Sequence, residues 1–257
     1  MRVYPPDVTA EPTPALLWIH GGGFVGGNLD MPESHAVCRA LARHGIQCVS
    51  VDYRLVPVFT PPWAGRAAVR FPLPLDDCEQ GWRYLIGKAH RFGAGRLYVG
   101  GASAGGALAA SLALRLRDSE TPPAGVALAY PLLHSDLPPM STELQQILRG
   151  WRRLRTFSSR SVRWMTRNYV GRDQLDLLPL ALPGGSDLTG FPPALIINSE
   201  RDSLRASGEA FADELKTYGR PVDIGYEPGT AHGHLNRPDT PAFERTITTI
   251  AQWVHSK

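Results

Sequence analysis

Short apolar runs alternate along the chain with longer segments in which apolar residues recur every three or four positions. The short runs are typical of strands buried in a parallel sheet, and the longer segments are typical of helices that cross over it. Strands are predicted at residues 15–20, 47–52, 97–100, 125–129, 194–199 and 222–226. Helices are predicted at residues 34–44, 76–88, 104–117, 206–218 and 241–255. The pattern therefore predicts an α/β fold with a mostly parallel sheet.

The strand signals stop between Pro131 and Pro193. This stretch is helical in parts, at residues 142–154 and 161–169, and then becomes rich in glycine and proline. Residues 53–75 also contain many prolines and are expected to be mostly irregular. We interpret residues 131–193 as an excursion from the sheet and expect a single domain over residues 1–257.

The small net charge limits the kinds of macromolecule that the protein is expected to bind. The 27 Lys and Arg residues and 24 Asp and Glu residues give a net charge of +3, and the densest basic run, residues 149–155, is best interpreted as a solvated helix face. A nucleic-acid partner is therefore not expected. Because no apolar run reaches the roughly 18 residues of a membrane span, and the first 14 residues have no apolar signal-peptide core, we expect a cytoplasmic location.

The chain has three cysteines, Cys38, Cys48 and Cys78, without CxxC spacing. An odd number at this spacing argues against a disulfide framework and a structural zinc site. We expect all three to be small apolar residues of the core, held reduced. No His, Asp or Glu pair has a metal-binding spacing such as HExxH, so no metal site is expected.

The sequence Gly101-Ala102-Ser103-Ala104-Gly105 fits the G-x-S-x-G nucleophile elbow. In that motif a strand turns so tightly into a helix that the serine hydroxyl stands above the carboxyl edge of the sheet. A predicted strand precedes this segment and a predicted helix follows it, as the motif requires. Ser103 is therefore the predicted nucleophile, with the helix N-terminus favouring negative charge beside it.

A glycine-rich segment, His20-Gly21-Gly22-Gly23-Phe24, follows the first long predicted strand. A glycine turn is one interpretation. The other is an oxyanion hole, because residues without Cβ let backbone N–H groups approach a ligand. Such donors stabilise the oxyanion of ester hydrolysis, and HGGG loops of this kind occur in lipases and esterases.

Two further residues complete a triad in the chain order Ser, Asp, His. Asp202 follows the predicted strand 194–199, and His232 follows the strand 222–226. Both therefore lie at the same sheet edge as Ser103, with His232 as general base and Asp202 as the acid that orients it. Glu200 as the acid and His234 as the base remain alternatives, since each lies two residues from the preferred position.

Together these segments resemble the hormone-sensitive-lipase-like carboxylesterases, also called bacterial family IV esterases. The resemblance rests on residues 20–24, Tyr53-Arg54-Leu55-Val56-Pro57, Phe71-Pro72 with Asp76-Asp77, residues 101–106, Asp202 with Leu204, and His232-Gly233. It implies an α/β-hydrolase fold with helices on both faces of the sheet. It also implies an oxyanion hole formed by the N–H groups of Gly22, Gly23 and Ala104, and hydrolysis of short-chain to medium-chain acyl esters without a cofactor.

The chain departs from the family pattern in three places. Ala102 stands where the family usually has Asp or Thr, and His234 stands where an aromatic residue is usual. Only 19 residues precede His20, so the family's N-terminal cap is expected to be reduced or absent. We therefore expect a more open pocket, covered by residues 131–193, and a sheet edge that could pair with another copy in a homo-oligomer. Apolar candidates for the pocket wall are Trp151, Trp164, Met165 and Tyr169.

Two alternatives to ester hydrolysis stay open. An amidase or arylformamidase would use the same triad, and the sequence does not separate it from an esterase. A ligand-binding protein without catalysis is the second alternative, because the gibberellin receptors resemble this family. Those receptors have lost the catalytic histidine, whereas this chain keeps Ser103, Asp202 and His232.

Overall fold

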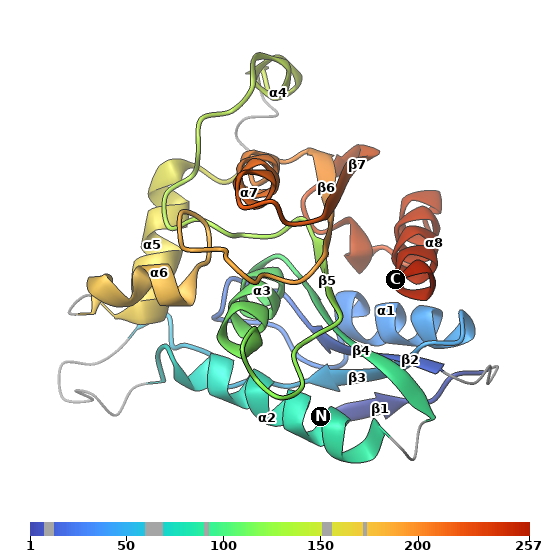
Figure 1. The fold of residues 1–257 in the computed structure, drawn as a ribbon. Helices are drawn as coiled ribbons and strands as arrows, with labels where there is room; N and C mark the ends of the chain where they lie inside the picture. Colours follow the sequence, from blue (N-terminus) through green and yellow to red (C-terminus); the bar gives the residue numbers. More distant parts are fainter. Residues whose placement is uncertain (8–12, 60–68, 90–92, 151–155, 172–173) are drawn as a thin grey trace.

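The predicted strands and a short additional strand, β1, pair into one sheet with the order β1-β3-β2-β4-β5-β6-β7 (Figure 1). The computed structural model describes residues 1–7, 13–59, 69–89, 93–150, 156–171 and 174–257. Neighbouring strands are parallel, except that β1 runs antiparallel to β3. The strands are β1 (Arg2–Tyr4), β2 (Thr13–Ile19), β3 (Gln47–Val51), β4 (Ala94–Ala102), β5 (Gly125–Ala129), β6 (Ala194–Arg201) and β7 (Val222–Ala231). The predicted α/β fold with a mostly parallel sheet is confirmed.

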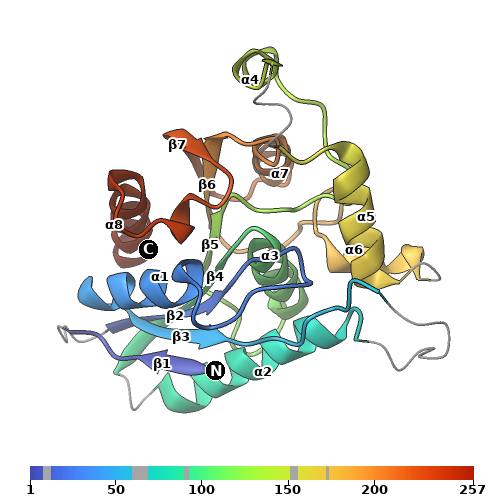
Figure 2. The same cartoon turned by 180° about the vertical axis from the view of Figure 1, so that it is seen from behind.

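Helices cover both faces of this sheet, as Figures 1 and 2 show from opposite sides. One face carries α1 (Pro32–Arg43) and α8 (Pro241–Ser256), and the other carries α2 (Leu73–Lys88), α3 (Ala104–Leu116) and α7 (Arg205–Thr217). Strand β2 is buried on both sides, since Leu17 and Ile19 pack in the core with α2 and α3 while Leu16 and Trp18 pack in the core with α1 and α8. Alternation of side chains along a strand produces these two cores.

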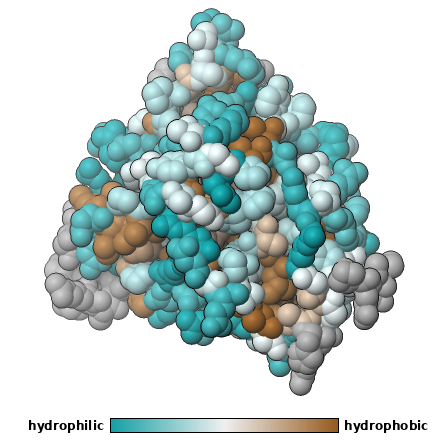
Figure 3. Space-filling model, in the orientation of Figure 1, coloured by the Kyte–Doolittle hydropathy of each residue, from teal (hydrophilic) through white to brown (hydrophobic). Residues whose placement is uncertain are grey.

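The segment between β5 and β6 leaves the sheet and is helical in parts. It contains α4 (Thr142–Ile147), α5 (Ser159–Val170), the 3₁₀ turn η4 (Leu175–Leu177) and α6 (Leu178–Ala181). Helix α5 buries Val162 and Tyr169 in the same core as α2 and α3. Its outer side and α6 carry the exposed Trp164 and Leu180, and Figure 3 shows an apolar patch over these helices.

Several element bounds differ from the predicted ones. Helix α2 begins at Leu73 instead of Asp76, because Pro74 fits the first turn of a helix, where no N–H bond is lost. Strand β4 begins three residues early, where Thr13 pairs with Ala94, and β7 continues to Ala231, which pairs with Arg201. Helix α4 ends at Ile147, earlier than predicted, and residues 151–155 lie outside the described residues.

All three cysteines are buried with free thiols. Burial raises the pKa of the Cys48 and Cys78 thiols well above their ordinary value, which keeps them protonated. They pack as small apolar side chains in the two cores, as predicted. Among the described residues, no helix has the length and apolar composition needed to cross a membrane.

Candidate active site

Ser103 lies at the sharp turn between β4 and α3. Its backbone has φ 54° and ψ −119°, a conformation that L-residues rarely adopt and that typically costs about 1–3 kcal/mol. The turn is held by hydrogen bonds from the Ser103 N–H to the Ala129 carbonyl, 2.9 Å, and from the Ala107 N–H to the Ser103 carbonyl, 3.2 Å. The side chain consequently stands at the N-terminus of α3, as the G-x-S-x-G pattern predicts.

Gly101 and Gly105 are required because the elbow touches the end of β2. A Cβ added to Gly105 would lie 2.1 Å from the Ile19 carbonyl oxygen and 2.3 Å from that of His20. A Cβ on Gly101 would lie 2.4 Å from the Gly105 carbonyl oxygen. Neither glycine has a positive φ, so it is the close approach of backbone to backbone that excludes larger residues.

A hydrogen-bonded relay joins the three predicted triad residues. The Nε2 atom of His232 lies 2.9 Å from the Ser103 Oγ, and its Nδ1 atom lies 2.5 Å from the Asp202 Oδ2. Asp202 follows β6 and His232 follows β7, so three strand ends supply the three side chains. The other carboxylate oxygen of Asp202 accepts the Leu204 N–H at 3.0 Å, which fixes its orientation.

The surroundings of His232 adjust its basicity. Burial opposes a charged imidazole, but the Asp202 carboxylate and, after it, Glu33 outweigh that effect and raise the pKa of His232 above its ordinary value. The Asp202 side chain is fully buried, whereas that of His232 is 22% exposed. His232 is therefore a stronger base than a free imidazole and still faces the solvent side of the site.

The glycine loop after β2 lies directly against Ser103. Gly22, Gly23 and Phe24 all have positive φ values, and a Cβ added to the neighbouring Gly21 would lie 3.0 Å from the Ser103 Cβ. None of the hydrogen bonds between described residues uses the N–H groups of Gly22, Gly23 or Ala104. These are the three donors that the family resemblance implies, and the loop geometry leaves them available to a ligand oxygen.

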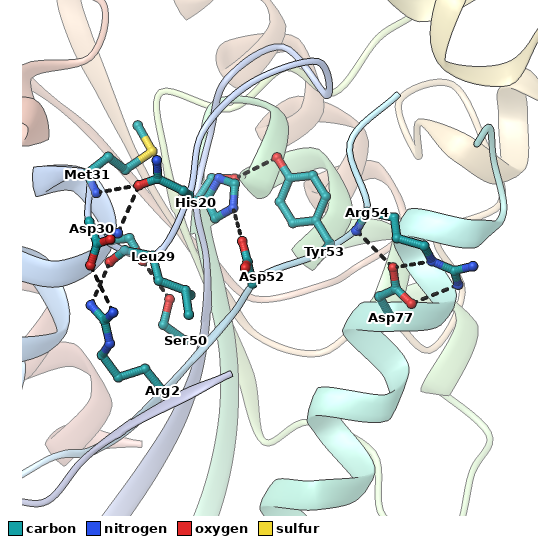
Figure 4. Close-up of polar contacts among 12 residues, drawn as sticks. Arg2, His20, Leu29, Asp30, Met31, Ser50, Asp52, Tyr53, Arg54 and Asp77 are labelled. Atoms are coloured by element: carbon teal, nitrogen blue, oxygen red, sulfur yellow. Dashed lines mark hydrogen bonds and ion pairs between the residues drawn. The ribbon is translucent and has the colours of Figure 1, made fainter. Parts of the chain in front are cut away.

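The Tyr53-Arg54 segment packs beside the start of this loop, where Figure 4 shows Tyr53 next to His20. The Tyr53 hydroxyl donates to the His20 carbonyl at 3.1 Å, and its ring stacks on the His20 ring with 4.5 Å between centroids. Arg54 is anchored to α2 by two side-chain hydrogen bonds to the Asp77 carboxylate, each 2.8 Å long. Burial lowers the pKa of His20, so its ring is a neutral structural part of the loop.

The two alternative triad residues have other partners. Glu200 accepts the Gly229 N–H at 2.7 Å. His234 bridges Ser199 and Thr246, with 2.9 Å to each hydroxyl, and burial lowers its pKa to about 4. His234 therefore fills the position that is usually aromatic with a neutral, hydrogen-bonded ring.

Glu33 is a buried carboxylate at this site that the sequence does not single out. It is 2% exposed and accepts hydrogen bonds from the Gly21 N–H at 2.7 Å and the Tyr130 hydroxyl at 2.7 Å. In the sequence it lies just before the predicted helix 34–44, where an acidic residue usually reflects the helix dipole alone, and the structure extends that helix back to Pro32. Only the fold brings it against the glycine loop.

Two side chains of the segment between β5 and β6 lie beside the site, Phe157 and Met165. The Phe157 ring meets the His232 ring edge-on at 4.8 Å, and it lines a cavity of about 830 Å³ with Leu137 and Met140. Of the predicted wall residues, Met165 faces Gly23, with its sulfur 3.3 Å from where a Cβ would stand.

Two further predicted wall residues, Tyr169 and Trp164, lie elsewhere. Tyr169 is fully buried in the core, where its ring stacks on Phe24 at 4.0 Å. Trp164 is 46% exposed and lines a separate cavity with arginines such as Arg160. Trp151 lies outside the described residues.

The profile of the Abhydrolase_3 family, described as alpha/beta hydrolase fold, matches residues 16–236. Carboxylesterase NlhH of Mycobacterium tuberculosis is 33% identical over 242 residues, which cover 92% of this chain and 71% of that protein. Ethyl acetate hydrolase of Pseudomonas putida is 34% identical over 247 residues, covering 91% and 71%.

Solved structures agree with these relatives. An esterase of Pyrobaculum calidifontis has a TM-score of 0.80 and 33% identity, and the match covers 99% of this chain and 79% of that chain. A bacterial heroin esterase has a TM-score of 0.80 and 31% identity, covering 99% and 78%. The resemblance drawn from the motifs is confirmed, and the chain belongs to the Abhydrolase_3 family of α/β-hydrolase-fold proteins.

Proposed function

We propose that this chain hydrolyses short-chain to medium-chain acyl esters through an acyl-enzyme formed on Ser103. The observation that carries the proposal is the relay from the Ser103 Oγ through the His232 imidazole to the Asp202 carboxylate, with distances of 2.9 and 2.5 Å. The chain is a carboxylic ester hydrolase by its relationship to esterases at 33% and 34% identity. The name ethyl acetate hydrolase belongs to one relative and supports a small ester as substrate.

The geometry suits two successive acyl transfers. His232 Nε2 accepts the hydroxyl proton as the Ser103 Oγ attacks the ester carbonyl, and the resulting oxyanion takes hydrogen bonds from the Gly22, Gly23 and Ala104 N–H groups. His232 then returns the proton to the leaving alcohol. A water molecule, activated by the same imidazole, hydrolyses the acyl-enzyme and releases the acid.

Covalent labelling tests the assignment. A p-nitrophenyl alkylphosphonate should inactivate the protein with one phosphonyl group on the peptide that contains Ser103, located by mass spectrometry. Hydrolysis of p-nitrophenyl butyrate should disappear in proportion to labelling. Stoichiometric labelling of another serine, or full activity after Ser103 is modified, would overturn the proposal. Cleavage of an aryl formamide faster than of the butyrate ester would favour an amidase instead.

The location of the protein in a cell and its oligomeric state were predicted from sequence alone. Both stay predictions, as does the single-domain organisation with residues 131–193 as an excursion near the site.

A further inference from the structure

Glu33 links three segments at the edge of the site. Its Oε1 atom accepts the Gly21 N–H at 2.7 Å, and its Oε2 atom accepts the Tyr130 hydroxyl at 2.7 Å and the Asn236 side-chain amide at 3.1 Å. Its own N–H donates to the Asn236 Oδ1 at 3.3 Å, and its carbonyl accepts the Trp18 indole N–H at 2.8 Å. A single residue of α1 thus contacts the glycine loop, the end of β5 and the 3₁₀ turn η5 (His234–Asn236).

The donors around Glu33 suit an acceptor-only carboxylate. Three N–H or O–H groups face its two oxygens, and among the described residues it has no ion-pair partner. Burial of a carboxyl group is costly without such hydrogen bonds. Burial, and after it the Glu33 carboxylate, raises the pKa of Tyr130 well above its ordinary value, so the Tyr130 hydroxyl stays protonated and donates.

Each contact of Glu33 leads to one part of the catalytic arrangement. Gly21 begins the glycine loop whose next two N–H groups are proposed as oxyanion donors. Tyr130 follows β5, and its ring lies edge-on to the His232 ring at 5.0 Å. Asn236 closes the turn that follows His232. Glu33 is therefore a residue through which the glycine loop (residues 20–24) and the loop that carries His232 (residues 232–236) are hydrogen-bonded to each other.

We propose that Glu33 is a positioning residue. It holds the glycine loop and the His232 loop in one geometry, and its negative charge stabilises the imidazolium form of His232. The proposal rests on the proposed function. Glu33 does not touch the reacting atoms, since its oxygens are occupied by Gly21, Tyr130 and Asn236. It acts through those neighbours, as an outer group fixes the orientation of an inner one.

Its charge matters because few other charges face His232. The groups around that ring are Asp202 from the turn after β6, Ser103 from the elbow, Tyr130 from the end of β5, and Phe157 and His234 at the sides. His234 is neutral near pH 7 because burial lowers its pKa to about 4. Asp202 and Glu33 are thus the two groups whose negative charge raises the pKa of His232 against the effect of burial.

The test compares Glu33→Gln and Glu33→Asp in steady-state kinetics on p-nitrophenyl butyrate. Glu33→Gln keeps the size and loses the charge. It should lower kcat about ten- to a hundredfold with little change in KM, as expected for lost hydrogen bonds to a charged group. The acidic limb of its kcat/KM profile should move to lower pH. Glu33→Asp keeps the charge, so its acidic limb should stay in place while kcat falls.

Controls separate this proposal from the proposed function. Glu79→Gln on α2, a glutamate whose ion pairs are with Arg83 and Arg115 and not with a relay residue, should leave kcat and the acidic limb unchanged. Ser103→Ala in the same assay reports whether the esterase assignment holds. Asn236→Ala, which cuts the histidine loop from Glu33, gives the kcat test if Glu33→Gln does not fold. Glu33→Gln with an unmoved acidic limb, or Asn236→Ala with unmodified kcat, would overturn the positioning role.

Discussion

His232 determines when this site can react, because only a neutral imidazole can accept the Ser103 proton. Burial alone would lower its pKa. The Asp202 carboxylate, 2.5 Å away, raises the pKa by more than burial lowers it. The same contact fixes the tautomer, since a proton on Nδ1 is needed for Nε2 to face the serine as an acceptor. One carboxylate therefore controls both the orientation and the basicity of the base.

The pH dependence follows from this shift. The pKa of His232 is raised above 6.5, so the protonated and inactive form persists to a higher pH than for a free imidazole. We expect kcat/KM for p-nitrophenyl butyrate to fall as the pH drops, with a midpoint above 6.5, and to be level on the alkaline side of that midpoint. A profile measured between pH 4.5 and 8.5 checks this, and full activity at pH 5 would contradict it.

At the scale of the elements, the site depends on how tightly the β4–α3 elbow fits against β2. The fit brings the glycine loop after β2 beside the serine before α3, so that the proposed oxyanion donors lie next to the proposed nucleophile. Glycines at 101 and 105 allow the backbones to touch. The backbone strain at Ser103 therefore lies in the same turn that positions its hydroxyl beside the glycine loop.

Replacing Gly105 by alanine should therefore be destabilising. The new Cβ would lie 2.1 Å from the Ile19 carbonyl oxygen, and overpacking of this kind typically costs about 1–3 kcal/mol. We expect Tm in a thermal melt to fall by about 2–10 °C. Gly87→Ala in helix α2 is the matched control, because nothing lies within 4 Å of its added Cβ and alanine favours a helix. Equal Tm values for the two variants would contradict this account of the elbow.

Sequence reasoning located the elements that carry the triad because their signals are local. GASAG lies between a strand and a helix, and Asp202 and His232 each follow an apolar run, so the parallel topology places all three at one edge. Glu33 and the hydroxyl of Tyr53 escaped prediction because their partners are distant: Glu33 meets Tyr130, 97 positions away. The stacking of Tyr169 on Phe24 is likewise set by tertiary packing, which no periodicity in α5 could indicate.

At the scale of the molecule, the β5–β6 excursion closes the site from one side. Phe157 brings it against His232, and Met165 brings it against the glycine loop. The cavity of about 830 Å³ beside Phe157 is lined by apolar side chains such as Leu137 and Met140 and by polar ones such as Gln145 and Thr156. We therefore expect the excursion to limit the length of the acyl group or alcohol that the catalytic edge accepts.

A series of esters with increasing acyl length tests how long a chain the site accepts. With p-nitrophenyl acetate, butyrate, hexanoate and octanoate, we expect kcat/KM to be maintained or to rise from acetate to hexanoate. A pocket that ends at an acetyl group would lose about ten- to two-hundredfold for each extra methylene. Phe157→Ala should move the preference toward longer chains. A steep loss beyond acetate in the unmodified protein would contradict an open pocket.

The relay itself is tested most directly by kcat for Ser103→Ala, His232→Ala and the double variant on p-nitrophenyl butyrate. If the hydroxyl and the imidazole act as one unit, each single change lowers kcat by at least about 10³-fold, and the double variant is no slower than the slower single variant. Either single variant hydrolysing the ester as fast as the unmodified protein, or losses that multiply in the double variant, would show that the two side chains do not act as one relay.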